Sequence, residues 1–322
     1  MILFQEHWYK NTQSFQRLKL LTDQFFFSSC EHWSDYVGDY SSVTALFIKL
    51  GSPVNSSILD KFPNLKYILT PTTGVDHISK SLQVCNSIKI VSLRGEYKLL
   101  ESITSTAEHS WSLLMKCARD YYNYSSLINN GVWSRDGLDI IQLRGKVLGI
   151  IGYGRLGKII AKYGQAFGMQ ILFCDVKTIR SNETDITQVS HTQLYSQSDF
   201  IIISASYDPV NLSKNLFISL PELQQIKRTA SIINISRGQL LDTQSALTRL
   251  INGNLRALAL DVLDDDSNWN PNLRYEYLKH LSSIKNLYLS PHIGGYAKDA
   301  ILDTRNFLLN SFLDFFCNEI HC

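Results

Sequence analysis

The chain has 322 residues, of which 44% are hydrophobic and 19% charged, and its formal net charge is +2. This mix can bury a full core and argues against intrinsic disorder. The sequence has no basic or acidic block, so it gives no electrostatic reason to expect a nucleic-acid or membrane-surface partner. Because a single core rarely grows past about 300 residues, we expect two domains.

The N-terminal residues and the cysteines bear on the compartment. The first ten residues, MILFQEHWYK, reach Glu6 and His7 too early for the apolar core of a signal peptide. The chain has no apolar run of 18 residues, so we expect no membrane span. None of the six cysteines forms a C-x-x-C pair or a zinc-type cluster with histidine. We therefore expect reduced thiols, no metal site and a cytoplasmic location.

The first hundred residues predict one small α/β unit. Residues 43–49 and 67–70 are rich in branched and aromatic side chains, as strands are. The loop 72–76 follows the second of these strands directly, and such loops bind ligands in open α/β sheets. Apolar residues then recur at helical spacing across residues 101–118, which predicts a long connecting helix.

From residue 146 onward, apolar strands alternate with helical stretches such as 156–167 and 243–252. The six apolar runs cover residues 147–151, 171–174, 200–204, 231–235, 257–262 and 287–290. Such alternation indicates a parallel sheet covered on both faces. The last segment, 297–316, is amphipathic, and we expect a helix that packs back on the first domain.

The predicted fold class is therefore α/β with two domains. One is a Rossmann-type, doubly wound parallel sheet, and the other is a smaller α/β domain. We place the smaller domain at residues 1–99 plus 293–322 and the doubly wound domain at residues 100–292.

A glycine-rich motif marks the nucleotide site. The sequence GYGRLG at residues 152–157 follows a predicted strand and opens a predicted helix. Gly152 permits a tight turn, Gly154 lets the backbone approach a pyrophosphate, and Gly157 lets helix and strand pack closely. The helix N-terminus offers N–H groups and positive potential to the phosphates. We predict that Arg155 and Leu156 of the same turn also contact the cofactor.

Asp175 lies 18 positions past Gly157, at the end of the next strand. Its carboxylate can accept hydrogen bonds from both adenosine-ribose hydroxyls, and its charge would repel a 2′-phosphate. The predicted cofactor is therefore NAD. Lys177 and Arg180 lie nearby in the sequence and leave NADP as the alternative.

Three further stretches follow predicted strands of the same sheet. They are NISRG at 234–238, DVLDDD at 261–266 and SPHIGG at 290–295. In doubly wound folds the carboxyl ends of the strands line the active crevice. An arginine, a carboxylate and a histidine at that edge form a usable catalytic set.

Taken together, these motifs resemble the D-2-hydroxyacid dehydrogenase family, which includes D-3-phosphoglycerate, D-lactate and formate dehydrogenases. The resemblance is strongest from residue 101 to 297 and weakest over the first 60 residues. Matching stretches are TTGVDHI at 72–78, TAEH at 106–109, GYGRLG at 152–157, NISRGQLLD at 234–242, ALDVLDDD at 259–266 and SPHIGG at 290–295. The resemblance implies hydride transfer between NAD(H) and a small D-2-hydroxy acid or 2-oxo acid, with D-3-phosphoglycerate among the options. It also implies that the smaller domain, residues 1–99 plus 293–322, is flavodoxin-like and binds the substrate, and that residues 100–292 form the NAD-binding domain.

The resemblance also implies roles for single residues. His292 matches the general acid/base, which suits imidazole because its ordinary pKa is about 6.5. Arg237 matches the residue whose planar guanidinium holds the substrate carboxylate and carbonyl. The backbone of three consecutive residues matches the loop that completes the carboxylate site: Thr73, Gly74 and Val75. Ile235 and Asp261 match residues that contact the cofactor, Asp261 at the nicotinamide carboxamide.

The carboxylate beside the histidine departs from the family pattern. Asp266 stands where most members carry Glu, and Ser267 replaces the usual following Pro. A carboxylate there would favour the imidazolium form of His292, but Asp reaches one methylene less far than Glu. Asp264 and Asp265 are rival candidates, although spacing from Asp261 favours Asp266. The stretch SASY at 204–207 also departs from the family at the adenine side.

Two other functions remain open on the sequence alone. A non-catalytic NAD-sensing or scaffold protein of the same fold is the main alternative, since fold does not prove turnover. Formate oxidation is disfavoured, because that branch carries Gln and not a carboxylate beside the histidine. Relatives are usually homodimers through the nucleotide domain, so we expect a homodimer with residues 101–142 as the candidate surface.

Overall fold

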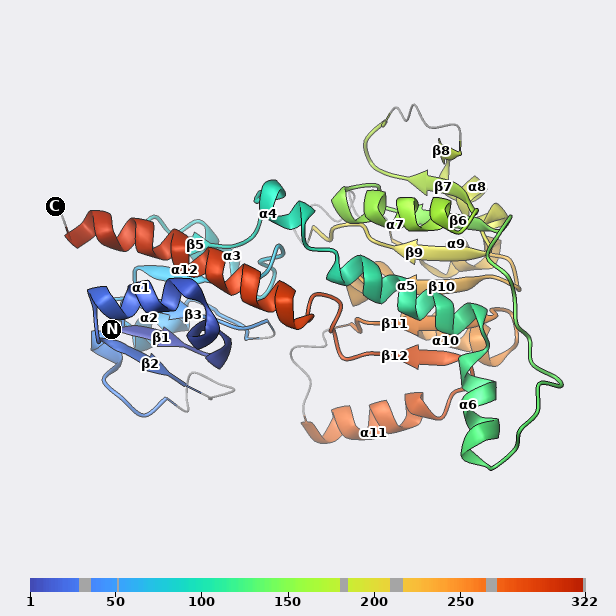
Figure 1. Cartoon of the computed structure of the whole chain (residues 1–322), viewed down its shortest axis with the longest axis horizontal. Coiled ribbons are helices and arrows are strands. Elements are labelled where there is room, and N and C mark those ends of the chain that lie inside the picture. The colour runs from blue at the N-terminus through green and yellow to red at the C-terminus, as the bar shows by residue number, and fades with distance from the viewer. Residues whose placement is uncertain (29–35, 51, 180–184, 209–216, 265–270, 321–322) are drawn as a thin grey trace. The chain divides into compact units, whose positions relative to one another are not determined.

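The computed structural model describes the chain except for residues 29–35, 51, 180–184, 209–216, 265–270 and 321–322, which are grey in Figure 1. It divides into two compact units. The first unit contains residues 1–103 and 296–322, and the second contains residues 104–295. The first unit is therefore discontinuous in sequence, with the second inserted into it.

The first unit is built on a five-stranded sheet in which every pair of neighbouring strands is parallel. The strand order is β2-β1-β3-β4-β5, which is the flavodoxin-like order 2-1-3-4-5. The strands are β1 (Ile2–Phe4), β2 (Phe25–Phe27), β3 (Ala45–Phe47), β4 (Tyr67–Leu69) and β5 (Lys89–Val91).

Helices cover both faces of this sheet because successive strand residues point to opposite sides. Leu46 and Ile68 pack with residues of α2 and α3, whereas Phe47 and Leu69 pack with residues of α1 and α12. Helices and 3₁₀ turns of this unit are η1 (His7–Asn11), α1 (Gln13–Leu21), η3 (Tyr40–Ser42), α2 (Ser57–Lys61), α3 (Lys80–Gln83), α4 (Tyr97–Glu101) and α12 (Lys298–Ile320).

A buried ion pair fastens the last helix to the segment that follows the first strand. Arg305 of α12 donates from Nε and Nη2 to the two carboxylate oxygens of Glu6, at 2.9 and 2.8 Å. Both side chains are at most 7% exposed. Removing one partner of such a buried pair leaves an uncompensated charge, which typically costs about 3–5 kcal/mol. The pair therefore specifies where α12 sits on the sheet.

The second unit is built on a seven-stranded parallel sheet in the order β12-β11-β10-β9-β6-β7-β8. The strands are β6 (Val147–Ile151), β7 (Gln170–Cys174), β8 (Ile186–Gln188), β9 (Phe200–Ile203), β10 (Ser231–Asn234), β11 (Ala257–Leu260) and β12 (Leu287–Leu289). Counted from β6, this is the Rossmann order 3-2-1-4-5-6 with β12 added at one edge. The chain reverses its direction of progress at β6, between β7 and β9, which is where such folds bind dinucleotides.

Two hydrophobic clusters lie on opposite faces of this sheet, and they confirm the predicted α/β fold class. Ile202 and Ile233 pack with α5 and α7, whereas Ile201 and Ile232 pack with α8, α9 and α10. Figure 1 shows α5 and α7 together on one side of the strands. The helices and the 3₁₀ turn of this unit are α5 (Ser105–Ala118), α6 (Tyr121–Asn129), α7 (Arg155–Ala166), α8 (His191–Gln197), α9 (Leu220–Gln225), η5 (Gly238–Leu240), α10 (Thr243–Ile251) and α11 (Pro271–Ser282).

Within the described part of the chain, every helix is too short or too polar to cross a bilayer. The cysteines described there, Cys85, Cys117, Cys174 and Cys317, are unpaired thiols.

Candidate functional site

The glycine motif forms the turn between β6 and α7. Gly152 has a φ of +89°, and a Cβ on it would lie 2.4 Å from the Cα of Ala205. A Cβ on Gly157 would lie 2.3 Å from the carbonyl oxygen of Gly152. The Gly152 N–H also donates to the carbonyl oxygen of Cys174 at 2.9 Å. These two glycines are therefore required by the protein's own packing.

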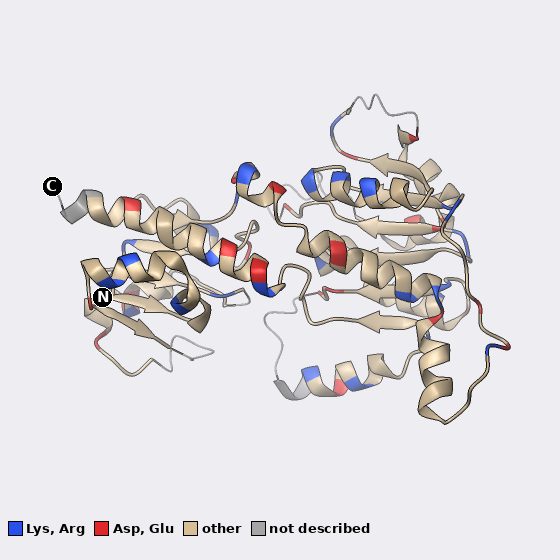
Figure 2. Cartoon of the chain, in the orientation of Figure 1, with Lys and Arg blue, Asp and Glu red and all other residues tan. Residues whose placement is uncertain are grey.

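Gly154 serves a different purpose. A Cβ on this residue would meet nothing within 4 Å, so the backbone here borders open space at the N-terminus of α7. A pyrophosphate needs such an approach, and the helix N-terminus supplies positive potential toward it. Figure 2 shows several Lys and Arg residues on α7, so the surroundings are basic as well. The turn therefore fits the diphosphate of a dinucleotide.

Asp175 follows β7 and is anchored to this turn. Its Oδ2 accepts from the Tyr153 N–H at 2.8 Å, and its Oδ1 accepts from the Lys177 N–H at 3.0 Å. Each carboxylate oxygen has two acceptor positions, so both can still receive a ribose hydroxyl. This donor and acceptor set fits the adenosine ribose of NAD. Arg180, the more distant basic neighbour, lies outside the described residues.

Two substitutions separate cofactor binding from folding. Gly154→Ala is expected to leave the free energy of unfolding unchanged, because its φ of −76° suits any residue and a Cβ meets no atom. It should weaken NADH binding about tenfold or more, because the methyl enters the phosphate approach. The matched control, Gly152→Ala, should instead destabilise the fold by about 2–4 kcal/mol through positive φ and overlap with Ala205. Denaturant unfolding and NADH fluorescence titration check both; equal NADH affinity in Gly154→Ala and wild type would contradict the prediction.

Arg237 lies just after β10, in a segment held by a buried asparagine. The side chain of Asn234 donates from Nδ2 to the Arg237 carbonyl oxygen at 2.9 Å and accepts from the Ser236 N–H at 3.1 Å. The guanidinium donates from Nη1 to the Ser236 carbonyl oxygen at 2.9 Å. A Cβ on Gly238 would lie 2.2 Å from the Leu263 carbonyl carbon, so this segment packs directly on the one after β11. The Arg237 side chain is half-buried, and Ile235 is buried.

His292 lies in the turn after β12, and its backbone is left-handed, with a φ of 54°. Its N–H donates to the carbonyl oxygen of Asp261 at 2.8 Å and is also 3.0 Å from the Ser290 carbonyl oxygen. Asp261 in turn donates its N–H to the Asn234 carbonyl oxygen at 2.9 Å. The segments after β10, β11 and β12 are thus hydrogen-bonded side by side, and the structure brings the Arg237, Asp261 and His292 segments to one edge.

The carboxylate of Asp261 holds that turn together. Its Oδ1 accepts from Ser290 Oγ at 2.6 Å and from the Ile293 N–H at 2.9 Å, and its Oδ2 accepts from the Gly294 N–H at 2.8 Å. The side chain is only 1% exposed. Burial raises the pKa of this carboxyl, but hydrogen bonds from His109, Ser290 and the two amides outweigh it and hold the pKa below its ordinary value. Asp261 is therefore a buried carboxylate that stays ionised.

Other predicted site residues lie elsewhere or outside the described chain. Asp265 and Asp266 fall outside the described residues, and Asp264 is exposed. The loop with Thr73, Gly74 and Val75 follows β4 in the first unit. Within that unit the loop is fastened by Thr72 Oγ1, which donates to the Gly74 carbonyl oxygen at 2.6 Å, and by a 3.0 Å contact between Thr70 Oγ1 and His77 Nε2.

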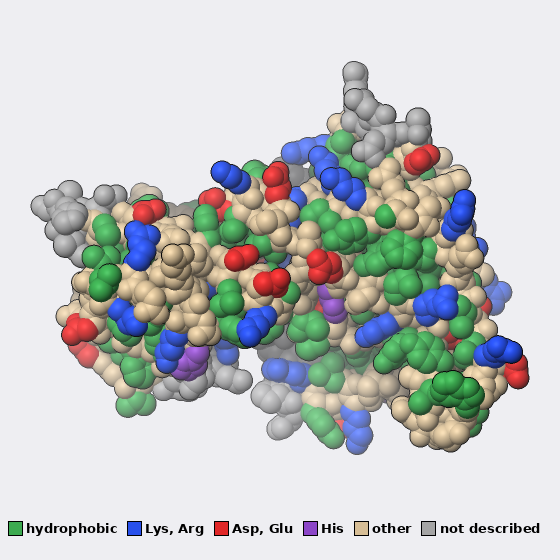
Figure 3. All heavy atoms as spheres, in the orientation of Figure 1, with side chains coloured by type: hydrophobic (Ala, Val, Ile, Leu, Met, Phe, Trp, Pro, Cys, Tyr) green, Lys and Arg blue, Asp and Glu red, His purple; other side chains and the backbone are tan. Residues whose placement is uncertain are grey.

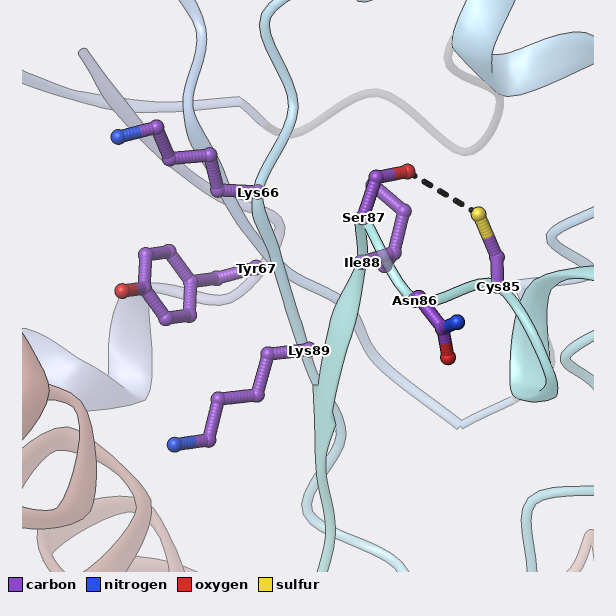
Figure 4. Close-up of a pocket in the computed structure, with 7 residues that line it drawn as sticks. All are labelled: Lys66, Tyr67, Cys85, Asn86, Ser87, Ile88 and Lys89. Atoms are coloured by element: carbon purple, nitrogen blue, oxygen red, sulfur yellow. Dashed lines mark hydrogen bonds between the residues drawn. The ribbon is translucent and has the colours of Figure 1, made fainter.

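An open pocket of about 560 Å³ lies in the first unit, but it contains no predicted site residue. Figure 4 shows the side chains of Lys66, Tyr67 and Lys89 on one side of it and the Cys85–Ser87 hydrogen bond on the other. Among the described residues, no group of three His, Cys, Asp or Glu side chains could hold a metal ion.

Comparisons with known proteins show which family the chain resembles in sequence. A family sequence model described as "D-isomer specific 2-hydroxyacid dehydrogenase, NAD binding domain" matches residues 111–294. The glyoxylate reductase of Thermococcus kodakarensis is 28% identical over 264 residues, which cover 78% of this chain and 74% of that protein. The hydroxypyruvate reductase of Thermotoga maritima is 28% identical over 260 residues, or 80% of each chain.

A likeness to solved structures concerns the fold. The crystal structure of D-lactate dehydrogenase from Aquifex aeolicus, complexed with NAD and lactic acid, superposes with a TM-score of 0.83. The two sequences are 22% identical, and the match covers 100% of this chain and 97% of the other. The two chains therefore share one fold over the whole of this chain and nearly all of the other.

Proposed function

Because this chain belongs to the D-isomer specific 2-hydroxyacid dehydrogenase family and is an NAD-dependent oxidoreductase, we propose that it reduces a small 2-oxo acid to the D-2-hydroxy acid at the edge formed by the Arg237, Asp261 and His292 segments. The observation that carries the proposal is the hydrogen-bonded arrangement of these segments beside one another, at the carboxyl ends of β10, β11 and β12. Bound NADH supplies the hydride, and NAD⁺ accepts it in the reverse direction.

Arg237 and His292 divide the remaining work between binding and proton transfer. The Arg237 guanidinium binds the substrate carboxylate in two-point fashion, which orients the adjacent carbonyl. An imidazole nitrogen of His292 donates a proton to the carbonyl oxygen during reduction and takes it back during oxidation. Asp266 is proposed as the carboxylate that favours the protonated ring, and the backbone of Thr73, Gly74 and Val75 as further donors to the substrate carboxylate.

The cofactor contacts are proposed for eight residues of the second unit. The glycine turn takes the pyrophosphate and Asp175 takes the adenosine ribose, as their geometry supports. Asp261 is proposed at the nicotinamide carboxamide, and its Oδ2, with one protein donor, has an acceptor position for it. The full set is Gly152, Gly154, Arg155, Leu156, Gly157, Asp175, Ile235 and Asp261.

Asp175→Ser should shift the cofactor preference toward NADPH. Removing the carboxylate ends its repulsion of the 2′-phosphate, and Lys177 then remains the nearest charge in sequence. We expect the ratio of kcat/KM for NADPH to that for NADH to rise about tenfold, or about 1.4 kcal/mol. Steady-state kinetics with both cofactors measure this ratio. The control Asp185→Ser removes an exposed carboxylate of the same unit and should leave the ratio unchanged; a rise in the control as large as in Asp175→Ser would refute the assignment.

The substrate class is tested with a panel of 2-oxo acids and NADH. The panel contains glyoxylate, hydroxypyruvate, pyruvate and 3-phosphohydroxypyruvate, which differ in the substituent on the carbonyl carbon. Comparison of their kcat/KM values shows which substituent the enzyme prefers. A phosphorylated substrate, of the D-3-phosphoglycerate type, would need added cations, and Lys49, Arg94 and Lys98 of the first unit are the candidates. Turnover of any member supports an enzyme. NADH binding without turnover of any 2-oxo acid would favour the non-catalytic NAD-sensing or scaffold function.

We further propose a homodimer that forms through helix α6 and the segment after it. Helix α6 buries none of its residues, and Tyr121, Ile128 and Val132 are each at least 40% exposed. Figure 3 shows hydrophobic side chains gathered over α6, which is unusual for a surface left in water. Light scattering that gives the mass of one chain at micromolar concentration would exclude this dimer.

The unpaired thiols support a cytoplasmic location.

A further inference from the structure

His109, on helix α5, reaches the turn that carries His292, yet no role has been assigned to it. Its Nε2 is 2.8 Å from Ser290 Oγ and 3.1 Å from Asp261 Oδ1. Its side chain is 16% exposed, so these contacts are largely shielded from water. His109 therefore contacts Ser290 and Asp261, the two residues whose side chains support the turn.

The protons available at this site decide whether Nε2 of His109 donates or accepts a hydrogen bond. The Ser290 hydroxyl is 2.6 Å from Asp261 Oδ1, and a carboxylate can only accept, so the hydroxyl proton lies between them. Ser290 has no second proton to offer His109. The Nε2 atom of His109 therefore carries a proton and donates it toward Ser290 Oγ and Asp261 Oδ1, whichever charge state the ring has.

Helix α5 contacts the same turn at two further points. Ser105 Oγ donates to the Gly294 carbonyl oxygen at 2.6 Å. A Cβ on Gly294 would lie 3.1 Å from Thr106 Cγ2 and 3.0 Å from Asp261 Oδ2, so a larger residue would push helix and carboxylate apart by a few tenths of an ångström. The N-terminal part of α5 thus packs against the loop that carries His292. Within this part of the helix, His109 is the residue that contacts the Asp261 carboxylate.

The turn needs such support because His292 adopts a left-handed backbone. A residue other than glycine in that conformation costs about 1–3 kcal/mol and persists only where its surroundings hold it. Here the holding bonds are those from the amides of His292, Ile293 and Gly294 to the backbone and side chain of Asp261. A shift of Asp261 would move all three amides, and with them the imidazole.

We propose that His109 is a positioning residue, which fixes Asp261 and Ser290 and thereby holds the left-handed turn that presents His292 to the substrate. The proposal rests on the proposed function of His292 as acid/base. Because His109 acts through the turn and not on the glycine motif or Asp175, its loss should reduce proton transfer far more than cofactor binding, which Asp261 affects only at the nicotinamide carboxamide. A misplacement of about 1 Å at a reacting group can lower the rate about 10²-fold.

The test compares two replacements of nearly equal length and volume. His109→Gln keeps an N–H donor near the position of Nε2, whereas His109→Met removes it. In His109→Met we expect kcat for 2-oxo acid reduction to fall about 10²-fold. We also expect the amides of Ile293 and Gly294 to exchange with solvent deuterium at least about tenfold faster. In His109→Gln both quantities should stay within about threefold of wild type. NADH affinity should change much less than kcat in both variants, because the glycine turn and Asp175 are unaltered. His280→Met, on the exposed face of α11, is the control for a histidine-to-methionine change as such.

Two results would overturn the proposal. One is wild-type kcat and wild-type amide exchange in His109→Met. The other is an equal loss of kcat in the Gln and Met variants with exchange unchanged, which would assign the effect to ring shape and not to the donated proton. Amide exchange needs no substrate, so it decides whether His109 holds the turn even if the wild-type protein reduces no 2-oxo acid. Absence of wild-type turnover would count against the proposed function instead.

Discussion

Replacement of His292 by Asn is expected to lower kcat for 2-oxo acid reduction by about 10²–10⁴-fold, the range that a general acid/base supplies. Asn is chosen because it adopts left-handed backbone more readily than most residues, and the φ at this position is 54°. The turn should therefore persist while the imidazole is lost. Stopped-flow measurement of NADH oxidation gives the chemical step, and fluorescence titration gives NADH affinity, which should be unchanged.

Two companion variants sharpen this test. His292→Ala removes the imidazole without preserving the preference for positive φ, so it should match the Asn variant in kcat but destabilise the turn further. His280→Asn replaces an exposed histidine of the same unit and should keep wild-type kinetics. Retention of more than about a tenth of wild-type kcat in His292→Asn would remove this residue from the proton-transfer role.

Replacement of Arg237 by Lys should lower kcat/KM for the 2-oxo acid by about 10²-fold, or about 2.7 kcal/mol of transition-state stabilisation. The charge is kept, but a lysine ammonium cannot form the two parallel hydrogen bonds that a guanidinium forms with a carboxylate. We expect a higher KM for the oxo acid and a lower kcat, because the carbonyl is also less well oriented. Initial rates over a range of oxo acid concentrations separate the two effects.

The control for Arg237 is Arg228→Lys, which changes an exposed arginine of the same unit. It should leave both constants unchanged. The NADH dissociation constant of Arg237→Lys should also equal that of the wild type, since the glycine turn lies at β6 and not at β10. An Arg237→Lys variant with wild-type kcat/KM would show that the substrate carboxylate is bound elsewhere.

The fold was predictable where the chain buries continuous apolar strands. The runs that became β6, β9, β10 and β11 are covered on both faces, so their sequences are almost wholly apolar and their ends are sharp. Strand β8 was missed because its residues, Ile186-Thr187-Gln188, are few and only one is buried at this sheet edge. A short edge strand takes its structure from its neighbour's backbone, and not from a pattern of its own.

The glycine turn was predictable because local backbone geometry requires glycine at fixed positions. These positions fall within six consecutive residues, so they form a motif that the sequence shows directly. The role of His109 is of a different kind, because it depends on helix α5 packing 181 residues away from Ser290 in sequence. The only sequence signal was its place in the TAEH stretch, which indicates a family and not a contact. The set of hydrogen bonds that Asp261 receives from His109, Ser290, Ile293 and Gly294 likewise needs the folded turn.

The ion pair between Glu6 and Arg305 has a consequence for synthesis of the protein. Ribosomes release the chain from its N-terminus, so residues 1–103 emerge long before α12, which covers Phe47 and Leu69. Until then helix α1 alone covers that side of the sheet, whereas residues 104–295 form a compact unit from a continuous segment. Domains generally fold as units during synthesis. The inserted unit should therefore fold first. The first unit should be completed last, when Arg305 of α12 pairs with Glu6.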